Sequence, residues 1–322
     1  MEQKIKIPIV IDGKKINTKT QAIGADPNDD GIQWYSYSVI DQSHIDQAIT
    51  IAEKSSWSQK SADERRAILV EVADYMSTQR PRSIAVMTRD AGKTVAEADP
   101  EVSEAIDFAR FYASRIDDDK STPIGTVLVI PPWNFPYAIP AGGLFAALAA
   151  GNPVLFKPAP ETVATAWELA QQLWAAGIPK DALQFLPSLD DENGKYLVTH
   201  PSIKALILTG AFDTATMFVQ WRNELNLLAE TSGKNALLIT ACADIDAAVK
   251  DLVQSAFGHA GQKCSAASLG IVIENITKIQ HSFANSLMMY QVLKLALDII
   301  LEHLLDQLSS RQRAIFPMRS II

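Results

Sequence analysis

A cysteine and a glutamate late in the chain are the residue types that covalent catalysis at a carbonyl group requires. Cys264 follows Gly-Gln-Lys in a segment of small and polar residues, and Glu230 begins Glu-Thr-Ser-Gly-Lys-Asn 34 positions earlier. An accessible cysteine thiolate is a good nucleophile, and a carboxylate can be the base that activates water. In the functional interpretation, Cys264 forms a covalent adduct and Glu230 helps water to release the product.

Each of these residues also has a structural interpretation. An isolated free cysteine is more often a small buried hydrophobe, and an isolated glutamate is usually solvated. Cys264 is expected on a loop, because His259 and Gly261 interrupt the helical pattern that ends near Phe257. Glu230 is expected on a loop between a helix and the strand that follows it. From these two residues alone, both interpretations stay open.

Three further positions could bind an anion or a cofactor. Asn134 lies in Pro-Pro-Trp-Asn-Phe-Pro directly after an apolar run, and its amide is either an Asx-turn group or a donor to an oxyanion. Lys157 ends a second apolar run and is either a surface cation or a ligand for hydroxyls and phosphate. Thr209 and Gly210 end a third run, where they either form a turn or approach a flat cofactor ring.

The apolar runs before these residues predict a parallel sheet. Runs without polar alternation, separated by helical patterns, are typical of an α/β protein whose sheet is covered on both faces. Strands are expected at 126–130, 153–157, 183–187, 205–209 and 236–240, and helices at 138–150, 162–176, 191–199, 213–228 and 244–258. Because parallel sheets bind ligands beyond the carboxyl ends of their strands, the ligand edge is expected at 131–136, 157–161 and 209–212.

The first part of the chain contains short strand patterns at 7–11 and 34–40, followed by a helical region from 43 to about 115. Ser61 and Glu64 form the expected capping box of one helix, and another helix is expected to follow Pro100. No Gly-x-Gly-x-x-Gly occurs, so the usual dinucleotide fingerprint does not identify the cofactor.

Composition limits the classes of function. The chain has 322 residues, of which 48% are hydrophobic and 20% charged, with a formal net charge of -8. An acidic balance argues against nucleic acid as the main partner. Two cysteines without metal-ligand spacing predict neither a metal site nor a disulfide framework. There is no apolar signal segment and no apolar run of about 18 residues, so a cytoplasmic protein without a membrane span is expected.

Five motifs, in this order, resemble the NAD(P)-dependent aldehyde dehydrogenase family. They are Trp-Asn-Phe-Pro at 133–136, Gly-Asn at 151–152 with Lys-Pro at 157–158, Thr-Gly at 209–210, Glu-Thr-Ser-Gly-Lys-Asn at 230–235 and Gly-Gln-Lys-Cys-Ser at 261–265. The resemblance covers roughly residues 7–274. Within the family it is most similar to the L-glutamate-γ-semialdehyde (Δ1-pyrroline-5-carboxylate) dehydrogenases, which occur alone or as the C-terminal module of proline-utilisation proteins.

The resemblance implies catalytic roles for three residues and a substrate-binding role for a fourth. Cys264 would attack the aldehyde to form a thiohemiacetal, and Asn134 and the Cys264 backbone N–H would bind the oxyanion. Glu230 would activate the water that hydrolyses the resulting thioester to glutamate. Ser265 matches a position at which semialdehyde dehydrogenases contact the substrate carboxylate.

The resemblance also implies NAD as the cofactor. Lys157 would bind the adenosine ribose, and Thr209 with Gly210 would lie near the nicotinamide. Two departures from the family pattern affect this region. The family often has a ribose-binding glutamate where this chain has Pro160, with Glu161 one step later, and its usual Phe-Thr-Gly-Ser is Leu-Thr-Gly-Ala here.

The sequence predicts three regions. Residues 1–228 are expected to form an NAD-binding domain with an N-terminal helical segment, and 229–275 the start of a catalytic domain. All 15 glycines lie at or before Gly270, whereas leucine accumulates in 276–322, so this tail is expected to be helical or disordered and unrelated to the family. Because the family continues with a complete catalytic domain, the sequence predicts a chain truncated by a disruption near residue 275.

Three functions follow as alternatives. The first is NAD-dependent oxidation of L-glutamate γ-semialdehyde to glutamate in proline degradation. The second is an inactive, truncated remnant that binds NAD or an assembly partner. The third is another aldehyde dehydrogenase, such as a succinate-semialdehyde dehydrogenase. Full-length relatives are expected to form homo-oligomers, but residues 116–123 are too short for the long hairpin with which many of them dimerise.

Overall fold

The computed structural model describes residues 5–29, 31–117, 122–240 and 242–272. The described residues form two compact units. The first contains the chain up to Asp26 and Ile32–Thr231, and the second contains Pro27–Gly31 and the residues from Ser232 onward. The division after Thr231 lies three residues beyond the predicted boundary at 228. The predicted tail, 276–322, lies outside the described residues, as do residues 118–121 of the short segment 116–123.

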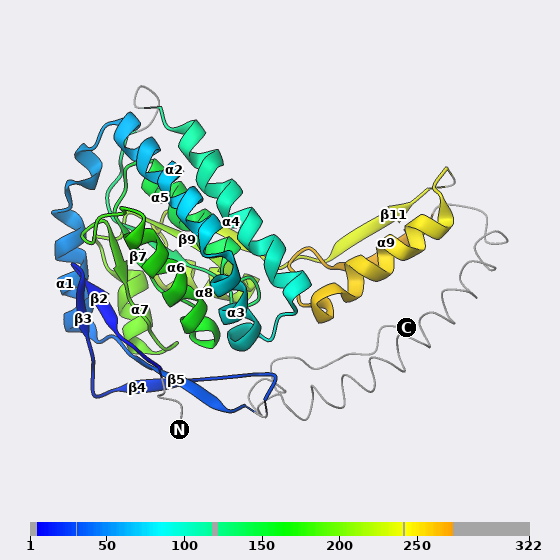
Figure 1. The fold of residues 1–322 in the computed structure, drawn as a ribbon, viewed down its shortest axis with the longest axis horizontal. Coiled ribbons are helices and arrows are strands. Elements are labelled where there is room, and N and C mark those ends of the chain that lie inside the picture. Colours follow the sequence, from blue (N-terminus) through cyan, green and yellow to red (C-terminus); the bar gives the residue numbers. More distant parts are fainter. Residues whose placement is uncertain (1–4, 30, 118–121, 241, 273–322) are drawn as a thin grey trace. The chain divides into compact units, whose positions relative to one another are not determined.

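A seven-stranded mixed sheet forms the centre of the first unit (Figure 1). In spatial order its strands are β10 (Leu227–Thr231), β9 (Ala205–Gly210), β6 (Val127–Ile130), β7 (Val154–Phe156), β8 (Leu183–Phe185), β2 (Ile9–Ile11) and β3 (Lys14–Ile16). The first five are parallel, and β2 and β3 extend the sheet in antiparallel fashion. The predicted α/β fold with a parallel sheet is confirmed.

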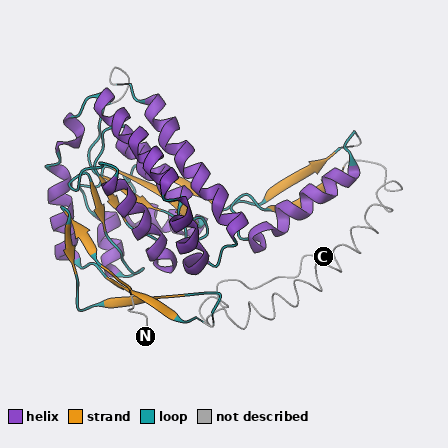
Figure 2. Ribbon diagram, in the orientation of Figure 1, coloured by secondary structure: helices purple, strands orange, loops and turns teal. Residues whose placement is uncertain are grey.

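Helices cover both faces of this sheet (Figure 2). Val127 and Val129 enter a cluster with α2 (Ala62–Thr78), α4 (Val95–Arg115), α5 (Ala138–Ala149) and α6 (Val163–Ala175). Leu128 and Ile130 enter a second cluster with α1 (Gln42–Glu53), α7 (Glu192–Thr199) and α8 (Phe212–Trp221). Successive side chains of a strand point to opposite faces, so strands buried on both faces read as continuous apolar runs.

The remaining elements of the first unit lie around this core. A three-stranded sheet contains β1 (Ile5–Ile7), β5 (Gln33–Ser38) and β4 (Gln21–Ala25), so the strand predicted at 7–11 is divided between two sheets. Helix α3 (Arg80–Ala91) and the short helices η1 (Ser56–Gln59) and η2 (Pro160–Thr162) complete the unit. None of the described helices combines the length and the apolar character that crossing a membrane requires.

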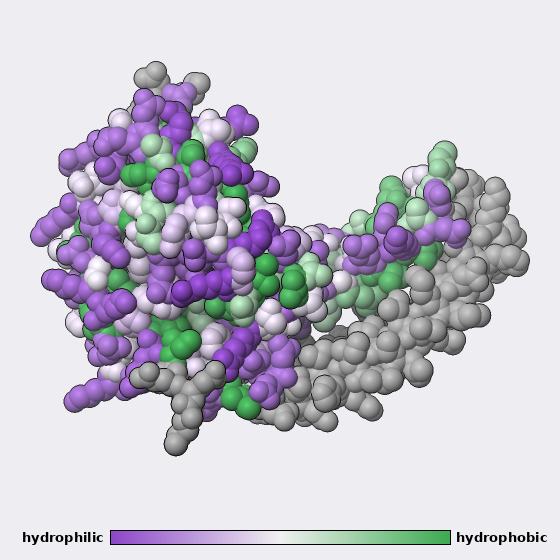
Figure 3. All heavy atoms as spheres, viewed as in Figure 1, coloured by the Kyte–Doolittle hydropathy of each residue, from purple (hydrophilic) through white to green (hydrophobic). Residues whose placement is uncertain are grey.

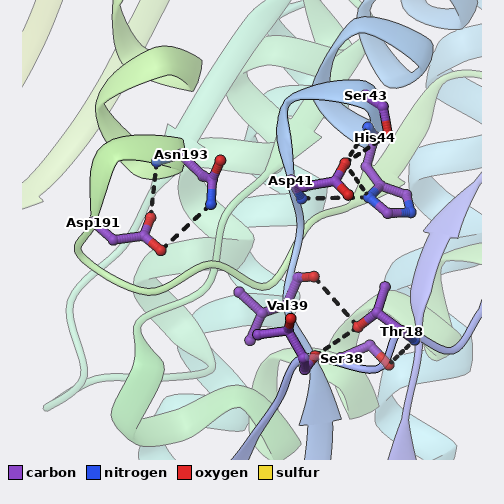
Figure 4. Close-up of polar contacts among 9 residues, drawn as sticks. Thr18, Ser38, Val39, Asp41, Ser43, His44, Asp191 and Asn193 are labelled. Carbon is purple, nitrogen blue, oxygen red and sulfur yellow. Dashed lines mark hydrogen bonds and ion pairs between the residues drawn. The ribbon is translucent and has the colours of Figure 1, made fainter.

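Helix starts follow capping rules. Ser61 and Glu64 form the predicted capping box of α2. Figure 4 shows Asp41 at the start of α1, where it accepts hydrogen bonds from Ser43 and His44, and Asp191 at the start of α7, where it accepts bonds from Asn193. Such side chains satisfy N–H groups that a helix leaves without an internal partner. In the same view the backbone N–H of Thr18 donates a hydrogen bond to the Ser38 hydroxyl, and the Thr18 hydroxyl donates to the backbone carbonyl of Val39.

The prediction that a helix follows Pro100 is wrong about where that helix begins. Helix α4 starts at Val95, and Pro100 lies inside it. Thr94 caps this start and forms a capping box with Glu97. Two N–H groups are satisfied by the box, which stabilises the first turn ahead of the proline.

The helix predicted at 213–228 is too long, and the strand after it was not predicted. Helix α8 ends at Trp221, and Leu227–Thr231 forms β10, which pairs with β9. Leucine, alanine and glutamate favour helices, but tertiary pairing overrides a weak local preference. Glu230 therefore lies in a strand and not in the predicted loop.

The second unit contains a smaller α/β element (Figure 1, yellow and orange). Strand β11 (Asn235–Ile239) leads through α9 (Ile245–Phe257) and η3 (Gly258–Gly261) to β12 (Ala267–Val272), which is parallel to β11. The strand at 236–240 and the helix at 244–258 agree with the predictions. Among the side chains of this unit that the structure describes, Ile239 is the one that is buried.

Candidate active site

Five of the predicted site residues lie at or just after the carboxyl ends of strands at one edge of the main sheet. Asn134 follows β6, Lys157 follows β7, Thr209 and Gly210 end β9, and Glu230 is the penultimate residue of β10. The chain runs from β6 through β7 to β8 in one direction and then returns to place β9 on the other side of β6. The carboxyl ends beside such a reversal are where open α/β sheets bind ligands.

Lys157 carries a cation on a buried stem. The residue is 5% exposed, and its Nζ lies 3.2 Å from Oδ1 of Asp190, whose side chain is 82% exposed. Its backbone N–H donates to the carbonyl of Val129, which fixes it beside β6. The ammonium is thus presented by a rigid backbone and paired with a solvated carboxylate. It can exchange that partner for ligand hydroxyls, because the Asp190 carboxylate is solvated and can return to water.

Glu230 and Thr209 face each other in the register of β10 and β9. Thr209 is half-buried and Glu230 is exposed. Burial, and secondly the Glu230 carboxylate, raise the pKa of Tyr112 in α4 above its ordinary value. The carboxylate of Glu230 therefore lies within electrostatic range of the Tyr112 hydroxyl, at the end of the sheet where Thr231 pairs with Gly210.

Two residues behind the Asn134 loop were missed by sequence reasoning. Glu101 of α4 is 1% exposed, and one of its oxygens accepts hydrogen bonds from the backbone N–H groups of Tyr137 and Ala138 at the start of α5. Lys93 forms a buried ion pair with the same carboxylate. Burial raises the pKa of Glu101, and the neighbouring Lys93 opposes that shift. Both residues stand within 8 positions of each other, but nothing in their spacing indicates a partner in α5.

Cys264 lies in the second unit, in the turn between η3 and β12, and is exposed. Ser265 follows it in the same turn and is exposed as well. The side-chain amide of Asn235 donates to the backbone carbonyls of Cys264, at 2.6 Å, and of Ala266, at 3.1 Å. The first residue of β11 thereby holds the loop that carries the predicted nucleophile.

The three residues 259–261, which precede the Cys264 loop, have left-handed backbone conformations. His259, Ala260 and Gly261 have φ angles of 57°, 53° and 71°. Such conformations are uncommon for residues with a Cβ, and a Cβ added at Gly261 would lie 3.0 Å from the carbonyl oxygen of Ala256. These three residues turn the chain out of α9 and toward the loop. Sequence reasoning found the break but not its geometry.

The structure therefore arranges the predicted residues in two groups. Asn134, Lys157, Thr209, Gly210 and Glu230 share the edge of one sheet, and Cys264 with Ser265 shares one loop of the other unit. The described residues contain no group of histidine, cysteine, aspartate or glutamate side chains that could hold a metal ion.

Comparison with known proteins places this arrangement among relatives. The profile of the Aldehyde dehydrogenase family matches residues 17–292. That match extends 17 residues beyond position 275, where the sequence predicts the resemblance to end. The 1-pyrroline-5-carboxylate dehydrogenase of Oceanobacillus iheyensis is 34% identical over 295 residues, which cover 84% of this chain and 57% of the relative. The chain thus spans little more than half the length of this curated relative.

Solved structures show the same fold. A 1-pyrroline-5-carboxylate dehydrogenase from Thermus with bound NAD has a TM-score of 0.79 and 29% identity, covering 84% of this chain and 57% of that one. Proline utilization A from Bdellovibrio bacteriovorus has a TM-score of 0.80 and 31% identity, covering 86% of this chain and 32% of that one.

Proposed function

The chain belongs to the aldehyde dehydrogenase family, and we propose that it oxidises L-glutamate γ-semialdehyde, formed from pyrroline-5-carboxylate, to glutamate with NAD as the hydride acceptor. One observation carries the proposal: Asn134, Lys157, Thr209, Gly210 and Glu230 lie at or just after the carboxyl ends of adjacent strands, at the ligand edge of the sheet. Relatives named 1-pyrroline-5-carboxylate dehydrogenase support this choice of aldehyde and a role in proline degradation.

The edge fits a nicotinamide dinucleotide. Lys157 would donate to the ribose hydroxyls in place of its contact with Asp190. Gly210 leaves room for a flat ring, because the nearest atom to an added Cβ there is Leu208 Cδ1, at 3.6 Å. A related enzyme from Thermus has been solved with NAD bound. The bound cofactor would supply one reaction, the acceptance of a hydride from the substrate carbon.

The residues of the chain would perform the other steps. The Cys264 thiolate adds to the aldehyde carbon, and the resulting oxyanion accepts hydrogen bonds from the Asn134 amide and the Cys264 N–H. Once the hydride has left, the carbon is a thioester. Glu230 takes a proton from water as that water adds to the thioester carbon, and the C–S bond breaks to return the thiolate. The hydroxyl of Ser265 would donate to the substrate carboxylate.

A direct assay tests the proposal. The purified chain is incubated with pyrroline-5-carboxylate and NAD, and NADH formation is followed by absorbance. We expect turnover that Cys264→Ala abolishes and that Cys242→Ala leaves unchanged, since both cysteines are exposed but Cys242 follows β11 and not the motif. Turnover that survives in Cys264→Ala would contradict the assigned nucleophile.

A second candidate function is the binding of NAD without turnover. It is favoured by the placement of Lys157, Thr209 and Gly210 in the first unit, whereas Cys264 lies in the second. Calorimetric titration with NAD separates the two functions. We expect Lys157→Met to weaken NAD binding by about tenfold or more, the loss expected for one hydrogen bond from a charged donor. Binding without NADH formation would support this second function over the first.

A further inference from the structure

The loop that carries Asn134 is fixed at its far end by a buried carboxylate. This loop, residues 131–136, connects β6 to α5. Glu101 Oε2 accepts from the N–H groups of Tyr137 and Ala138, both at 3.1 Å, and so anchors the first residues of the helix. The phenol of Tyr137 is buried and donates to Gln172 Oε1 at 2.6 Å, which fixes the side chain at the same point.

Lys93 connects this anchor to the middle of the loop. Its Nζ lies 2.5 Å from Glu101 Oε1 and 4.3 Å from the centre of the Phe135 ring. Lys93 is 5% exposed and Glu101 is 1% exposed, so both charges are held away from water. A cation over a ring face is attracted by the ring, and more strongly when desolvated. The ammonium therefore contacts the residue directly after Asn134.

A buried ion pair is weak evidence for stability by itself. Removing two charges from water costs free energy that their attraction recovers only in part, and apolar replacements of buried pairs are often neutral or stabilising. The structural effect of this pair is to connect a helix start to the loop before it. One carboxylate joins a cation to a helix start, and the same cation contacts the loop between the strand and that helix.

We propose that Lys93 and Glu101 are positioning residues that set the orientation of the Asn134 amide toward the oxyanion. This inference rests on the proposed function for its catalytic consequence. Neither residue touches the reacting atoms; both act through the loop. A donor aimed at the oxyanion loses much of its effect when its loop shifts, because preorganisation is the source of its catalytic value.

The chain offers a matched control for this pair. Asp90 of α3 is also buried, and its Oδ2 accepts from the N–H and hydroxyl of Thr165 at 2.7 and 2.8 Å, in the first turn of α6. Asp90 thus caps the helix after β7 as Glu101 caps the helix after β6. Asp90→Asn perturbs a buried carboxylate of the same kind without touching the Asn134 loop.

The first experiment measures the loop directly and needs no catalytic activity. The chain has six tryptophans, and four of them, Trp34, Trp57, Trp167 and Trp174, are 9% exposed or less. In a Trp221→Phe background, Trp133 is therefore the half-buried tryptophan that acrylamide reaches first. We expect Lys93→Met and Glu101→Gln to raise the quenching constant, with Asp90→Asn unchanged and Lys93→Arg restoring the original value.

The second experiment is a double-mutant cycle on turnover. We expect Asn134→Ala to lower kcat by about a hundredfold, and Lys93→Met by between about ten- and a hundredfold with little change in KM. In the Lys93→Met background, Asn134→Ala should then cost much less than it does alone. Independent, multiplicative losses would contradict the positioning role.

The two readouts separate the two proposals. If the chain binds NAD but shows no turnover, the proposed function fails, and the quenching measurement still decides whether the pair orders the loop. Unchanged Trp133 quenching in folded Lys93→Met and Glu101→Gln, checked by circular dichroism, overturns the inference whatever the activity.

Discussion

The two units hold their site residues in different ways. In the first, Asn134, Lys157 and Thr209 follow strands whose side chains enter hydrophobic clusters on both faces of a sheet. In the second, Cys264 lies on an exposed turn of an element with two described strands and one helix. Apolar residues, green in Figure 3, reach the surface of this unit. Leu238 and Leu269 are 57% and 55% exposed.

The difference indicates that the proposed cofactor binding and the proposed covalent chemistry depend on different amounts of structure. A cofactor edge needs fixed strand ends, and the covered sheet supplies them. A nucleophile needs a fixed loop, but among the described side chains of the second unit Ile239 alone is buried, so these residues bury little apolar surface to hold that loop. We therefore expect the first unit to keep its geometry under conditions in which the second opens.

Hydrogen exchange offers the largest test of this comparison. Amides of β6, which pairs with β7 and β9 at the centre of the sheet, should exchange only by global unfolding, at a cost of about 5–15 kcal/mol. Amides of β11 should exchange through local opening, more than about a thousandfold faster. Mass spectrometry of peptides from β6 and β11 measures the two exchange rates. Equal protection of both strands would contradict the expected difference in stability between the two units.

Paired leucine substitutions sharpen the same comparison. Leu128 is fully buried in β6, and Leu128→Ala should lower the free energy of unfolding by about 2–5 kcal/mol, because it leaves a cavity. Leu269→Ala, at an exposed position of β12, should change it by less than about 0.5 kcal/mol. Guanidinium denaturation followed by tryptophan fluorescence measures both. A large effect of Leu269→Ala would mean that the first unit depends on that residue.

The pH dependence of stability should differ as well. Burial raises the pKa of Asp90 to about 7, so the folded state holds a proton between about pH 4 and 7 that the unfolded chain releases. The contribution of Asp90 to stability is therefore full below pH 4 and decreases as pH rises to 7. We expect wild type to lose stability relative to Asp90→Asn across that window. Denaturation midpoints at several pH values measure this, and a parallel dependence in both proteins would contradict it.

The described part of the second unit contains no buried carboxylate of this kind. Its described carboxylates, Asp29, Asp244, Asp246 and Asp251, are all exposed.

Sequence patterns predicted the parts of the fold that depend on local burial. Residues 126–130 and 153–157 are apolar on both faces, so they could be assigned to buried strands without knowing their neighbours. The ligand edge followed from the direction of those strands. The predicted positions of Asn134 and Lys157 after them agree with the structure.

The parts of the fold and of the candidate site that were missed depend on contacts between residues far apart in the sequence, or on strand pairing at the edge of the main sheet. Strand β10 has the composition of a helix and is a strand because β9 pairs with it. The contact of Glu101 with Tyr137 crosses 36 positions, and that of Asn235 with Cys264 crosses 29. No local pattern predicts which buried carboxylate meets which helix, since the pairing is decided by how the helices pack.

The smallest expected effect tests how firmly the Cys264 loop is held. Asn235→Ala removes two hydrogen bonds to that loop, each of which contributes about 1 kcal/mol. Because Cys264 is already exposed, its reaction with Ellman's reagent should accelerate only a few-fold, whereas Cys242, outside these bonds, should react as before. Mass spectrometry of each labelled peptide gives the two rates within one sample. An unchanged ratio would show that the left-handed turn before Cys264 holds the loop without Asn235.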